Sequence, residues 1–377
     1  MLAPLIRIKL PLGRLSIPIN LPVRFQSSLT SHLYPRPGDR VIVAMSGGVD
    51  SSVCAYLLHK QEYNVEGVYM RNWDTVDEKS VCTGDQDWKD VQNVCKQIGI
   101  PCRMINFIKE YWIQVFTKAI DDYARGLTPN PDVMCNREIK FGRLLEKILG
   151  SSHNDEDGIW MATGHYAQRE VAPCGKIKLL RAVDSTKDQT YYLSTVPEEK
   201  LQRTIFPIGH LTKLQVRQIA NEANLIIANK AESMGLCFVG EKNKFADFLG
   251  EWFVYQKDVE NNSIIVVPGS TNILLFSRKL VARDWVWCWN KPPDGIEKGI
   301  DLLGQVRYRQ VAEPCKVTMR SDFKYLVEFS VPIQAVAPGQ YVAVWDGNWC
   351  LGGGVIEESL RDFDESDKIT LTDSDQS

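Results

Sequence analysis

Residues 41–52 read Val-Ile-Val-Ala-Met-Ser-Gly-Gly-Val-Asp-Ser-Ser, and this stretch decides the fold class of the chain. Val41 to Met45 is a short apolar run typical of a buried parallel strand. Ser46-Gly47-Gly48 interrupts the run, and residues 50–60 then predict a helix. A glycine turn and a helix N-terminus direct unpaired backbone N–H groups and the positive end of the helix dipole to one point. The stretch therefore predicts an anion site, and a plain tight turn is the alternative.

The glycines in this loop suit a phosphate ligand. Gly47 and Gly48 have no Cβ, so a phosphate can approach the backbone closely. The loop has no Lys where a GxxxxGK[ST] loop would have one, which argues against γ-phosphate transfer of the Walker type. Ser-Gly-Gly-x-Asp-Ser resembles the pyrophosphate loop of the ATP pyrophosphatases, which cleave ATP between the α and β phosphates to adenylate a substrate.

The segments after the loop alternate between strand and helix patterns. Strands are predicted at 65–70, 102–107, 159–163 and 177–183, and helices at 88–98, 110–125, 137–149 and 212–223. This alternation predicts an α/β fold with a parallel sheet that has helices on both faces. Ligands in such sheets bind beyond the carboxyl ends of the strands, where Ser46, Met70 and Gly164 are expected.

From Gln305 the pattern changes to short alternating segments, which predict a small antiparallel β-barrel. Its strands are expected at 306–309, 315–320, 325–329, 341–345 and 350–356. Pro338-Gly339 and Asp346-Gly347-Asn348 supply turns between them. The domains expected are a transit peptide at 1–38, an adenine-nucleotide-binding domain at 39–210, a central domain at 211–300, the barrel at 301–356 and a disordered acidic tail at 357–377.

The composition is that of an ordinary globular protein without a membrane span, with 44% hydrophobic and 24% charged residues in 377. The net charge of −3 means that binding to nucleic acid would require local basic patches. Residues 1–38 contain five basic residues and no acidic one, with interspersed Ser and Thr. This composition is typical of an organellar transit peptide and predicts import into the mitochondrial matrix, and a disordered tail is the alternative.

The ten cysteines include no CxxC pair and no zinc-ribbon spacing, and we expect no metal ion held by protein ligands alone. Cys54, Cys95, Cys102, Cys288 and Cys315 lie in apolar runs and are expected in the core.

Cys135 and Cys237 lie in more informative surroundings. Thr128-Pro129-Asn130-Pro131-Asp132-Val133-Met134-Cys135-Asn136 places a cysteine at or just before a predicted helix, where its thiol pKa would be lowered. Asp132 could move a proton at the same substrate atom. A proline-rich turn with a capping Asp and a buried Cys is an equal alternative. Glycines flank Cys237 in residues 234–240, although such a Cys is more often a buried residue of a short strand.

Together these stretches resemble one family, the tRNA-specific 2-thiouridylases in their mitochondrial form. The resemblance covers most of residues 40–250 and 302–356. The matching segments are 46–52, 70–73, 106–107, 110–112, 128–136 with 139–141, 163–167, 187–189, 235–240, 306–310, 338–340 and 350–354.

The resemblance implies how ATP and sulfur would be handled. ATP, with Mg²⁺, would adenylate the C2 oxygen of the wobble uridine in tRNAs for Lys, Glu and Gln. Met70 and Gly164 would contact the adenosine. Cys237 would carry a persulfide received from a donor protein, Cys135 would release the sulfur and form a disulfide with Cys237, and Asp132 would be the general acid/base. The phosphates would bind Ala44, Met45, Ser46, Gly47, Gly48, Val49, Asp50 and Ser51.

The resemblance also implies where tRNA would bind. The target base would leave its stack to enter the pocket. The segments implied to hold it and the nearby tRNA are Asn130, Pro131 and Asp132, Lys187, Asp188 and Gln189, and Arg307 with Tyr308 in the barrel.

One departure from the family lies near residue 250. In the family, the segment matching Phe248-Leu249 is followed by several tens of residues of a central domain, whereas here Gly250-Glu251 runs directly into Trp252-Phe253-Val254. We therefore expect a shortened central domain near 250/251, which affects tRNA docking and residues 251–300.

Three alternatives remain open from the sequence. The chain could be a pyrophosphate-loop ligase that adenylates a small molecule, such as an amidotransferase or an argininosuccinate synthase relative. It could be a tRNA-binding form that transfers no sulfur. Asp132, Cys135 and Cys237 could also ligate an iron–sulfur cluster.

Overall fold

Strand β1 (Arg40–Met45) lies inside a five-stranded parallel sheet with the strand order β3-β2-β1-β4-β7. The computed structural model describes residues 33–73, 83–150, 158–231 and 252–360. The other strands of this sheet are β2 (Asn64–Arg71), β3 (Cys102–Asn106), β4 (Ile159–Thr163) and β7 (Thr204–Ile205). The order reverses between β1 and β4, and at such a switch point the two flanking loops diverge and leave a crevice for a ligand.

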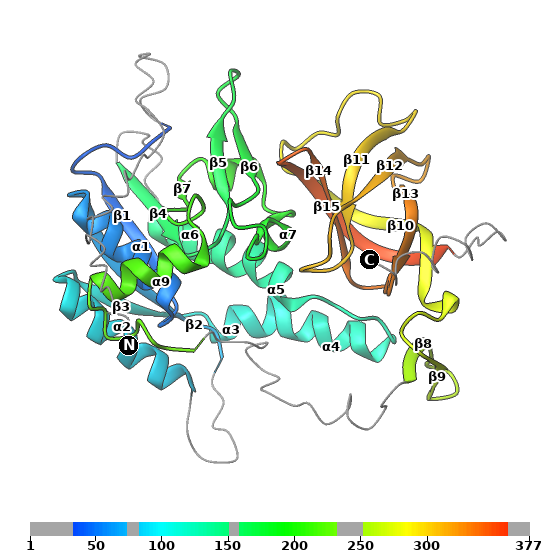
Figure 1. Ribbon diagram of the computed structural model, residues 1–377, viewed down its shortest axis with the longest axis horizontal. Helices are drawn as coiled ribbons and strands as arrows, with labels where there is room; N and C mark the ends of the chain where they lie inside the picture. Colours follow the sequence, from blue (N-terminus) through cyan, green and yellow to red (C-terminus); the bar gives the residue numbers. More distant parts are fainter. Residues whose placement is uncertain (1–32, 74–82, 151–157, 232–251, 361–377) are drawn as a thin grey trace, which may run out of the picture.

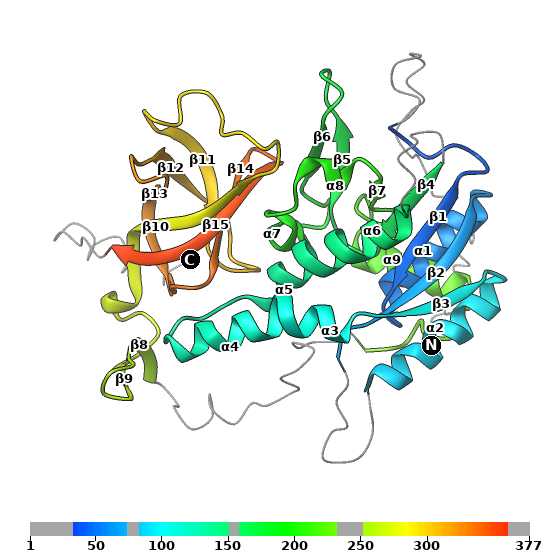
Figure 2. The ribbon, with the colours of Figure 1, turned by 180° about the vertical axis from the view of Figure 1, so that it is seen from behind.

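Alternate residues of β1 enter two different hydrophobic cores, one on each face of the sheet. Ile42 and Ala44 pack in the core that contains the helix of residues 131–149, whereas Val41 and Val43 pack against helices on the other face. Because both faces are covered, the strand is apolar at every position from Val41 to Met45, as the sequence predicted. Figures 1 and 2 show these layers from opposite sides.

The helices of the first domain follow the strands of the sheet. One face is covered by α1 (Val49–Lys60), α2 (Thr83–Ile98) and α9 (Lys213–Glu222). A continuous helical segment on the other side comprises α3 (Ile108–Tyr111), a π-helix (Trp112–Phe116) and α4 (Thr117–Ala124). A second comprises α5 (Pro131–Met134), a π-helix (Cys135–Leu144) and α6 (Leu145–Leu149). Short elements complete the domain: β5 (Gln168–Val171), β6 (Ile177–Leu180), α7 (Thr190–Leu193) and α8 (Glu198–Leu201).

Six antiparallel strands form a closed barrel, because β10 pairs with both β13 and β15. They are β10 (Phe276–Trp287), β11 (Ile300–Gln305), β12 (Glu313–Met319), β13 (Tyr325–Gln334), β14 (Tyr341–Asp346) and β15 (Trp349–Leu360). The α/β fold class and the C-terminal barrel are therefore confirmed. Between the first domain and the barrel lie the hairpin of β8 (Trp252–Asp258) and β9 (Ser263–Pro268) and a 3₁₀ turn at Ile273–Leu275.

Four details differ from the sequence predictions. The helix that carries Cys135 begins at Pro131 rather than 137, because Asn130 caps it by accepting a hydrogen bond from the Val133 N–H. Residues 306–310 form turns after β11, not a strand. The expected barrel start at 301 leaves out β10, which belongs to the same sheet. Residues 357–360 continue β15 in its pairing with β10, so the expected disorder does not begin at 357.

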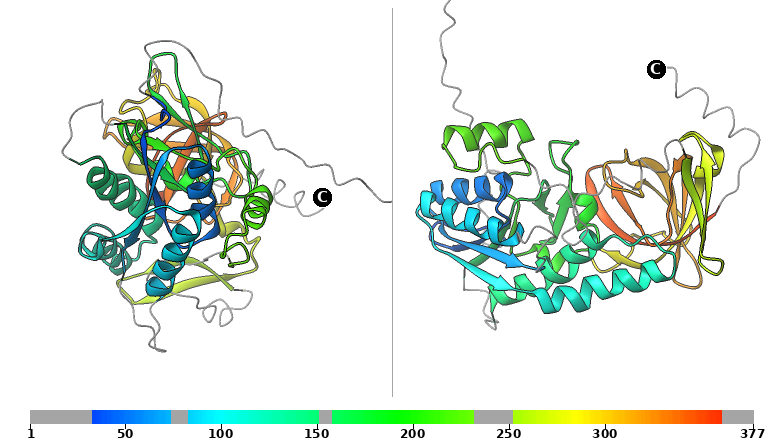
Figure 3. Two further views of the ribbon diagram at one scale, coloured as in Figure 1. Left: turned by 90° about the vertical axis from the view of Figure 1, so that its left-hand side faces the viewer. Right: turned by 90° about the horizontal axis from the view of Figure 1, so that it is seen from below.

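The barrel is joined to the first domain by a shared sheet and a shared core. β15 pairs with β6, so the barrel sheet continues into the β5–β6 hairpin. Trp345 on β14 packs in the core of the first domain, and its indole N–H donates to the Thr190 hydroxyl at 3.2 Å. Figure 3 shows the α3–α4 segment lying along both parts.

The turn at Pro338–Gln340 in the barrel contacts the loop before α5. The Thr128 N–H donates to the Pro338 carbonyl at 2.8 Å, and the Asn130 amide donates to Gln340 at 3.2 Å. Gly339 has a φ of +93°, and a Cβ there would lie 2.7 Å from the Thr128 nitrogen. The barrel therefore determines the path of the chain into α5.

We expect Gly339→Ala to lower the free energy of unfolding by about 1–3 kcal/mol, because alanine disfavours the left-handed conformation. The close contact of the new Cβ with Thr128 should add a further loss. Gly295→Ala is the matched control, because Gly295 has a φ of +86° and its Cβ would meet no atom within 4 Å. Urea unfolding measures both losses, and equal losses would contradict a close contact at Gly339.

Candidate active site

Two serines close the loop after β1. The Ser46 N–H donates to the Ser51 hydroxyl at 3.1 Å, and the two hydroxyl oxygens lie 3.1 Å apart. The Gly48 N–H donates to the Ser46 hydroxyl at 3.4 Å. Gly48 is the N-cap of α1 and has no side chain to cap it, so backbone N–H groups of the first turn are left for a ligand. The local geometry is that of an anion site at a helix N-terminus.

The ends of β2 and β4 lie at the same edge of the sheet as this loop. Gly164 follows β4, and a Cβ there would lie 2.8 Å from the Ser51 nitrogen in the first turn of α1. Met70 lies on β2, one residue after the partner of Met45 in the sheet. The structure thus brings the Ala44–Ser51 stretch, Met70 and Gly164 together, as the strand order requires.

Two lysines from distant parts of the sequence contact the loop. The Lys213 ammonium lies 2.7 and 2.8 Å from the two carboxylate oxygens of Asp50. The Lys230 ammonium donates to the Gly47 carbonyl at 3.0 Å and contacts Asp87 and Asp90 on α2. Burial lowers the pKa of Lys230, but its hydrogen bonds to the two carboxylates outweigh this effect and raise it overall.

Cys135 faces the carboxyl end of β2. The Asn72 amide nitrogen, just beyond β2, lies 3.9 Å from the Cys135 sulfur. Cys135 lies one turn inside its helix rather than at its N-terminus, where the helix dipole acts most strongly. The structural basis of the sequence argument for a helix-end thiolate is therefore missing, and Cys135 instead lies beside the residues that follow β2. Cys237 lies outside the described residues.

Burial raises the pKa of Asp132, and the charge of Lys140 partly offsets this effect. An aspartate whose pKa is raised in this way suits a group that gives and takes protons. The Asn136 amide donates to the Asp132 backbone carbonyl at 3.0 Å, within the same helix.

Lys140 connects the helix of residues 131–149, here called the cysteine helix, to the segment that follows β4. Its ammonium lies 3.4 Å from Nε2 of His165, which directly follows Gly164. Nδ1 of His165 lies 2.9 Å from the Thr163 hydroxyl, and burial, with a contribution from Lys140, lowers the pKa of His165 well below its ordinary value. The imidazole is thus neutral at physiological pH, and the cation at this junction is Lys140.

Residues implied in tRNA binding gather where the barrel meets the cysteine helix. The Tyr308 ring lies 4.4 Å from the Tyr192 ring, centroid to centroid. Burial is the main cause of the raised pKa of each tyrosine. The charge of Asp132 raises the pKa of Tyr192 further, and the charge of Lys187 lowers that of Tyr308. Both charges therefore lie near this aromatic pair. Burial also raises the pKa of the neighbouring Tyr191, and the charge of Arg307 acts in the opposite direction.

Asp188 and Gln189 have structural contacts that the sequence did not indicate. The Asp188 carboxylate is 7% exposed and accepts hydrogen bonds from Arg181, the Ala182 N–H and the Thr190 hydroxyl. The Gln189 side-chain carbonyl accepts from the Tyr166 N–H at 2.9 Å. These two side chains hold the backbone beside His165.

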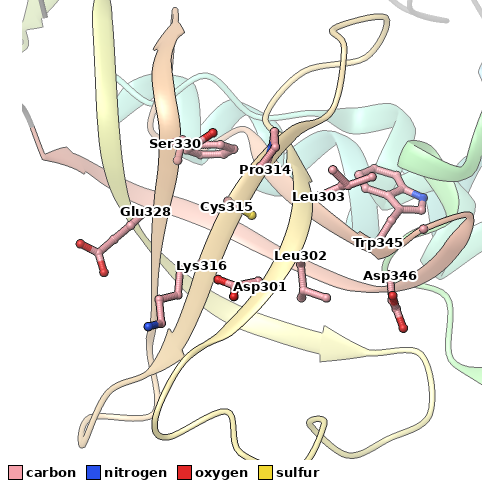
Figure 4. Close-up of a pocket in the computed structure, with 12 residues that line it drawn as sticks. Asp301, Leu302, Leu303, Pro314, Cys315, Lys316, Glu328, Ser330, Trp345 and Asp346 are labelled. Carbon is pink, nitrogen blue, oxygen red and sulfur yellow. The ribbon is translucent and has the colours of Figure 1, made fainter.

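A hollow of about 480 Å³ lies elsewhere, on the barrel (Figure 4). Its lining comes from β11, β12, β13 and β14 and includes Asp301, Lys316, Glu328 and Trp345. No candidate site residue lines it, so this hollow does not belong to the site formed at the edge of the parallel sheet.

Four residues that contact the site, Asn72, Lys140, Lys213 and Lys230, were not predicted from the sequence to have a role. Asn72 and Lys140 lie in segments that match the family, and Asn72 directly follows a predicted strand, which is a usable signal. The sequence around Lys213 and Lys230 does not indicate a role for them, because only the packing of α9 and of the chain after it brings them to the loop after β1.

The elevated pKa of Asp132 predicts how stability changes with pH. Because its pKa is higher in the folded than in the unfolded protein, the ionised carboxylate opposes folding at neutral pH. This destabilisation decreases as the pH falls through the pKa of Asp132 in the folded protein. It vanishes below the pKa of the unfolded protein, about 3.9. Urea unfolding should therefore show Asp132→Asn to be more stable than the parent at pH 7, with a gain that shrinks toward pH 4.

Asp121→Asn, at an exposed position, is the control and should show no such pH-dependent gain. A constant gain for Asp132→Asn at all pH values would contradict the burial of an ionised carboxylate.

Among the described residues, no helix has both the length and the apolar character of a membrane span. In the same ranges, no group of three or more His, Cys, Asp or Glu residues is arranged to hold a metal ion. Neither finding extends to residues 232–251, which include Cys237.

Comparison with known proteins identifies the two domains. Residues 39–241 match the tRNA methyl transferase HUP domain family, and residues 277–356 match the aminomethyltransferase β-barrel domain family. A solved structure titled as the U34-tRNA thiolase NcsA from Methanococcus maripaludis with its [4Fe-4S] cluster is similar over 59% of this chain and 70% of that chain, at 18% identity and a TM-score of 0.31. That score is too low to support a functional argument.

Two curated relatives are far more similar. The tRNA-specific 2-thiouridylase MnmA of Lysinibacillus sphaericus (strain C3-41) is 40% identical over 373 residues, covering 88% of this chain and 96% of the relative. The mitochondrial tRNA-specific 2-thiouridylase 1 of Schizosaccharomyces pombe is 38% identical over 400 residues, covering 90% and 96%. Identity at this level over nearly the whole of both chains shows that this protein belongs to the tRNA-specific 2-thiouridylase family.

Proposed function

We propose that this protein uses ATP to thiolate C2 of the wobble uridine, position 34, in mitochondrial tRNAs for Lys, Glu and Gln. The observation that carries the proposal is the meeting of two sites at one sheet edge. Asn72 contacts Cys135 on the cysteine helix. Lys140 on that helix contacts His165, which follows Gly164 beside the loop of residues 44–51, here called the nucleotide loop. A nucleotide and a thiol at one edge suit a reaction that first activates a carbonyl and then delivers sulfur.

The first step creates a leaving group on a poor electrophile. The C2 oxygen of uridine attacks the α-phosphate of ATP, pyrophosphate leaves, and the oxygen is adenylated. The backbone N–H groups of the loop from Ala44 to Ser51 bind the phosphates, and Met70 and Gly164 contact the adenosine. Mg²⁺ bound together with ATP would offset part of the negative charge on the leaving pyrophosphate.

The second step delivers sulfur from a cysteine persulfide to C2. A donor protein transfers sulfane sulfur to Cys237 to give a persulfide. The Cys135 thiolate attacks the inner sulfur, a Cys135–Cys237 disulfide forms, and hydrosulfide leaves. Hydrosulfide adds to C2 and AMP departs, which gives 2-thiouridine. A thiol reductant then restores both cysteines. Asp132 moves the proton, and its elevated pKa supports that role.

The target base reaches this site after leaving its stack. Asn130, Pro131, Lys187, Arg307 and Tyr308 form the entrance, where the barrel meets the cysteine helix. Asp188 and Gln189 act by holding the backbone of this entrance. The aromatic pair of Tyr192 and Tyr308 supports the proposal, because aromatic rings stack on single-stranded bases.

The mitochondrial matrix is the proposed location. The basic, acid-free segment at 1–38 and the similarity to a mitochondrial relative from S. pombe support it. Residues 1–32 lie outside the described residues.

The shortened central domain leaves a tRNA-binding form without sulfur transfer as the second candidate. The alignment with the L. sphaericus relative runs over 373 residues but takes in 88% of this 377-residue chain, so some aligned positions fall opposite gaps. The β8–β9 hairpin pairs only with itself among the described residues, and Trp252 and Ile264 on it are half exposed. A hairpin whose apolar side chains are this exposed within the described part of the chain fits a domain that has lost part of its structure.

Thiolation of tRNA tests the proposal directly. The protein lacking residues 1–38 is incubated with ATP, Mg²⁺, a persulfide donor and unmodified mitochondrial lysine tRNA, and the RNA is run on a mercury-containing gel. We expect a retarded band that requires ATP and disappears in Cys135→Ser and Cys237→Ser. Cys174→Ser, at an exposed cysteine outside the site, should leave the band unchanged.

Absence of the band with tRNA still bound would favour the binding form without catalysis. An ATP-dependent band that survives both substitutions would contradict the sulfur pathway proposed here.

A further inference from the structure

The nucleotide loop lacks the lysine of a Walker loop, but the fold places one beside it. Lys213, 163 positions after Asp50, contacts both oxygens of the Asp50 carboxylate at 2.7 and 2.8 Å. Asp50 lies in the first turn of α1, the helix whose N-terminus forms the anion site. The positive charge of Lys213 is therefore located at the loop itself.

The position of Lys213 is set by the start of α9. Thr212 and Gln215 form a reciprocal capping box that begins the helix at Lys213. The Lys213 backbone N–H donates to the Asp184 carboxylate at 2.9 Å. Both interactions hold the base of the side chain, so the ammonium group is directed toward the loop before any ligand binds.

The surroundings show why a cation is required at this point. Asp50 is a carboxylate in the very turn that binds anions, and an unpaired charge there would repel phosphates. Its other contact is the Tyr166 hydroxyl, which donates at 3.0 Å and carries no charge. The Lys213 side chain is 13% exposed and that of Asp50 is 32% exposed, so the pair opens toward solvent on the Asp50 side.

Lys230 is a contrasting case at the other end of the loop. It contacts two carboxylates, Asp87 and Asp90, as well as the Gly47 carbonyl. That cluster carries a net negative charge, so Lys230 ties the loop to α2 and contributes no excess positive charge. Lys213 contacts the only carboxylate in residues 46–52, Asp50, and neutralises the charge that this side chain would otherwise present to a phosphate.

We propose that Lys213 is a phosphate-binding residue: it neutralises Asp50 and donates a hydrogen bond to the terminal phosphates of ATP, the part that leaves as pyrophosphate. This inference rests on the proposed use of ATP. It assigns to a residue of α9 the charge that other phosphate loops carry in their own sequence.

Calorimetry on the full chain with ATP and with AMP, both without Mg²⁺, tests this role. We expect Lys213→Met to weaken ATP binding about 10- to 100-fold, the usual effect of losing a charged hydrogen bond, and to change AMP binding by less than about threefold. Lys213→Arg should restore part of the ATP affinity. The control Lys324→Met removes a lysine that pairs with Glu357 in the barrel at 2.8 Å and should change neither affinity.

The double variant Asp50→Asn with Lys213→Met shows whether Lys213 binds the phosphates directly or only removes the repulsion between Asp50 and the phosphates. It also serves if Lys213→Met fails to fold, because the double variant leaves no carboxylate without its partner. We expect its ATP affinity to remain below that of the parent. Parental ATP affinity in the double variant, or equal losses for AMP and ATP in Lys213→Met, would overturn the proposal. Failure of the parent to bind any nucleotide would overturn the proposed function as well.

Discussion

The hydrogen bonds between the loop at Thr128–Asn130 and the barrel turn at Pro338–Gln340 are the contact on which the site depends. They determine where α5 begins, and thereby where Asp132 and Cys135 lie. The parallel sheet provides the nucleotide loop and packs against the cysteine helix, while the barrel turn holds the loop that leads into that helix. The barrel therefore helps to build the candidate site, in addition to any contact that it makes with tRNA.

The charged side chains around the site also come from segments that are distant in the sequence. The loop after β1 supplies backbone N–H groups but only a carboxylate, Asp50, as a charged side chain. Lys213 reaches that carboxylate from α9, and Lys140 reaches His165 from the cysteine helix. Adenylation concentrates negative charge between the nucleotide and the base, so cations on either side of the sheet edge match the needs of this chemistry.

The sequence predicted the parts of this structure that depend on local patterns. Strand 159–163 has the bounds expected, and the turn at Ser46–Gly48 was identified because an apolar run ends in glycines. The start of α5 was missed because two prolines obscured the capping role of Asn130. Residues 306–309 look like a strand but follow β11 as turns, and Arg309 has a φ of +66° there. Lys213 could not be found locally, since only tertiary packing brings it to Asp50.

The most direct test of the account is whether adenylation occurs without sulfur transfer. Pyrophosphate released from ATP by the Cys135→Ser variant is measured in a single turnover, with and without unmodified mitochondrial lysine tRNA. The account predicts pyrophosphate release that requires the tRNA and yields no thiolated product, because the nucleotide loop acts before the cysteine. Release without tRNA, or no release once Cys135 is replaced, would contradict it.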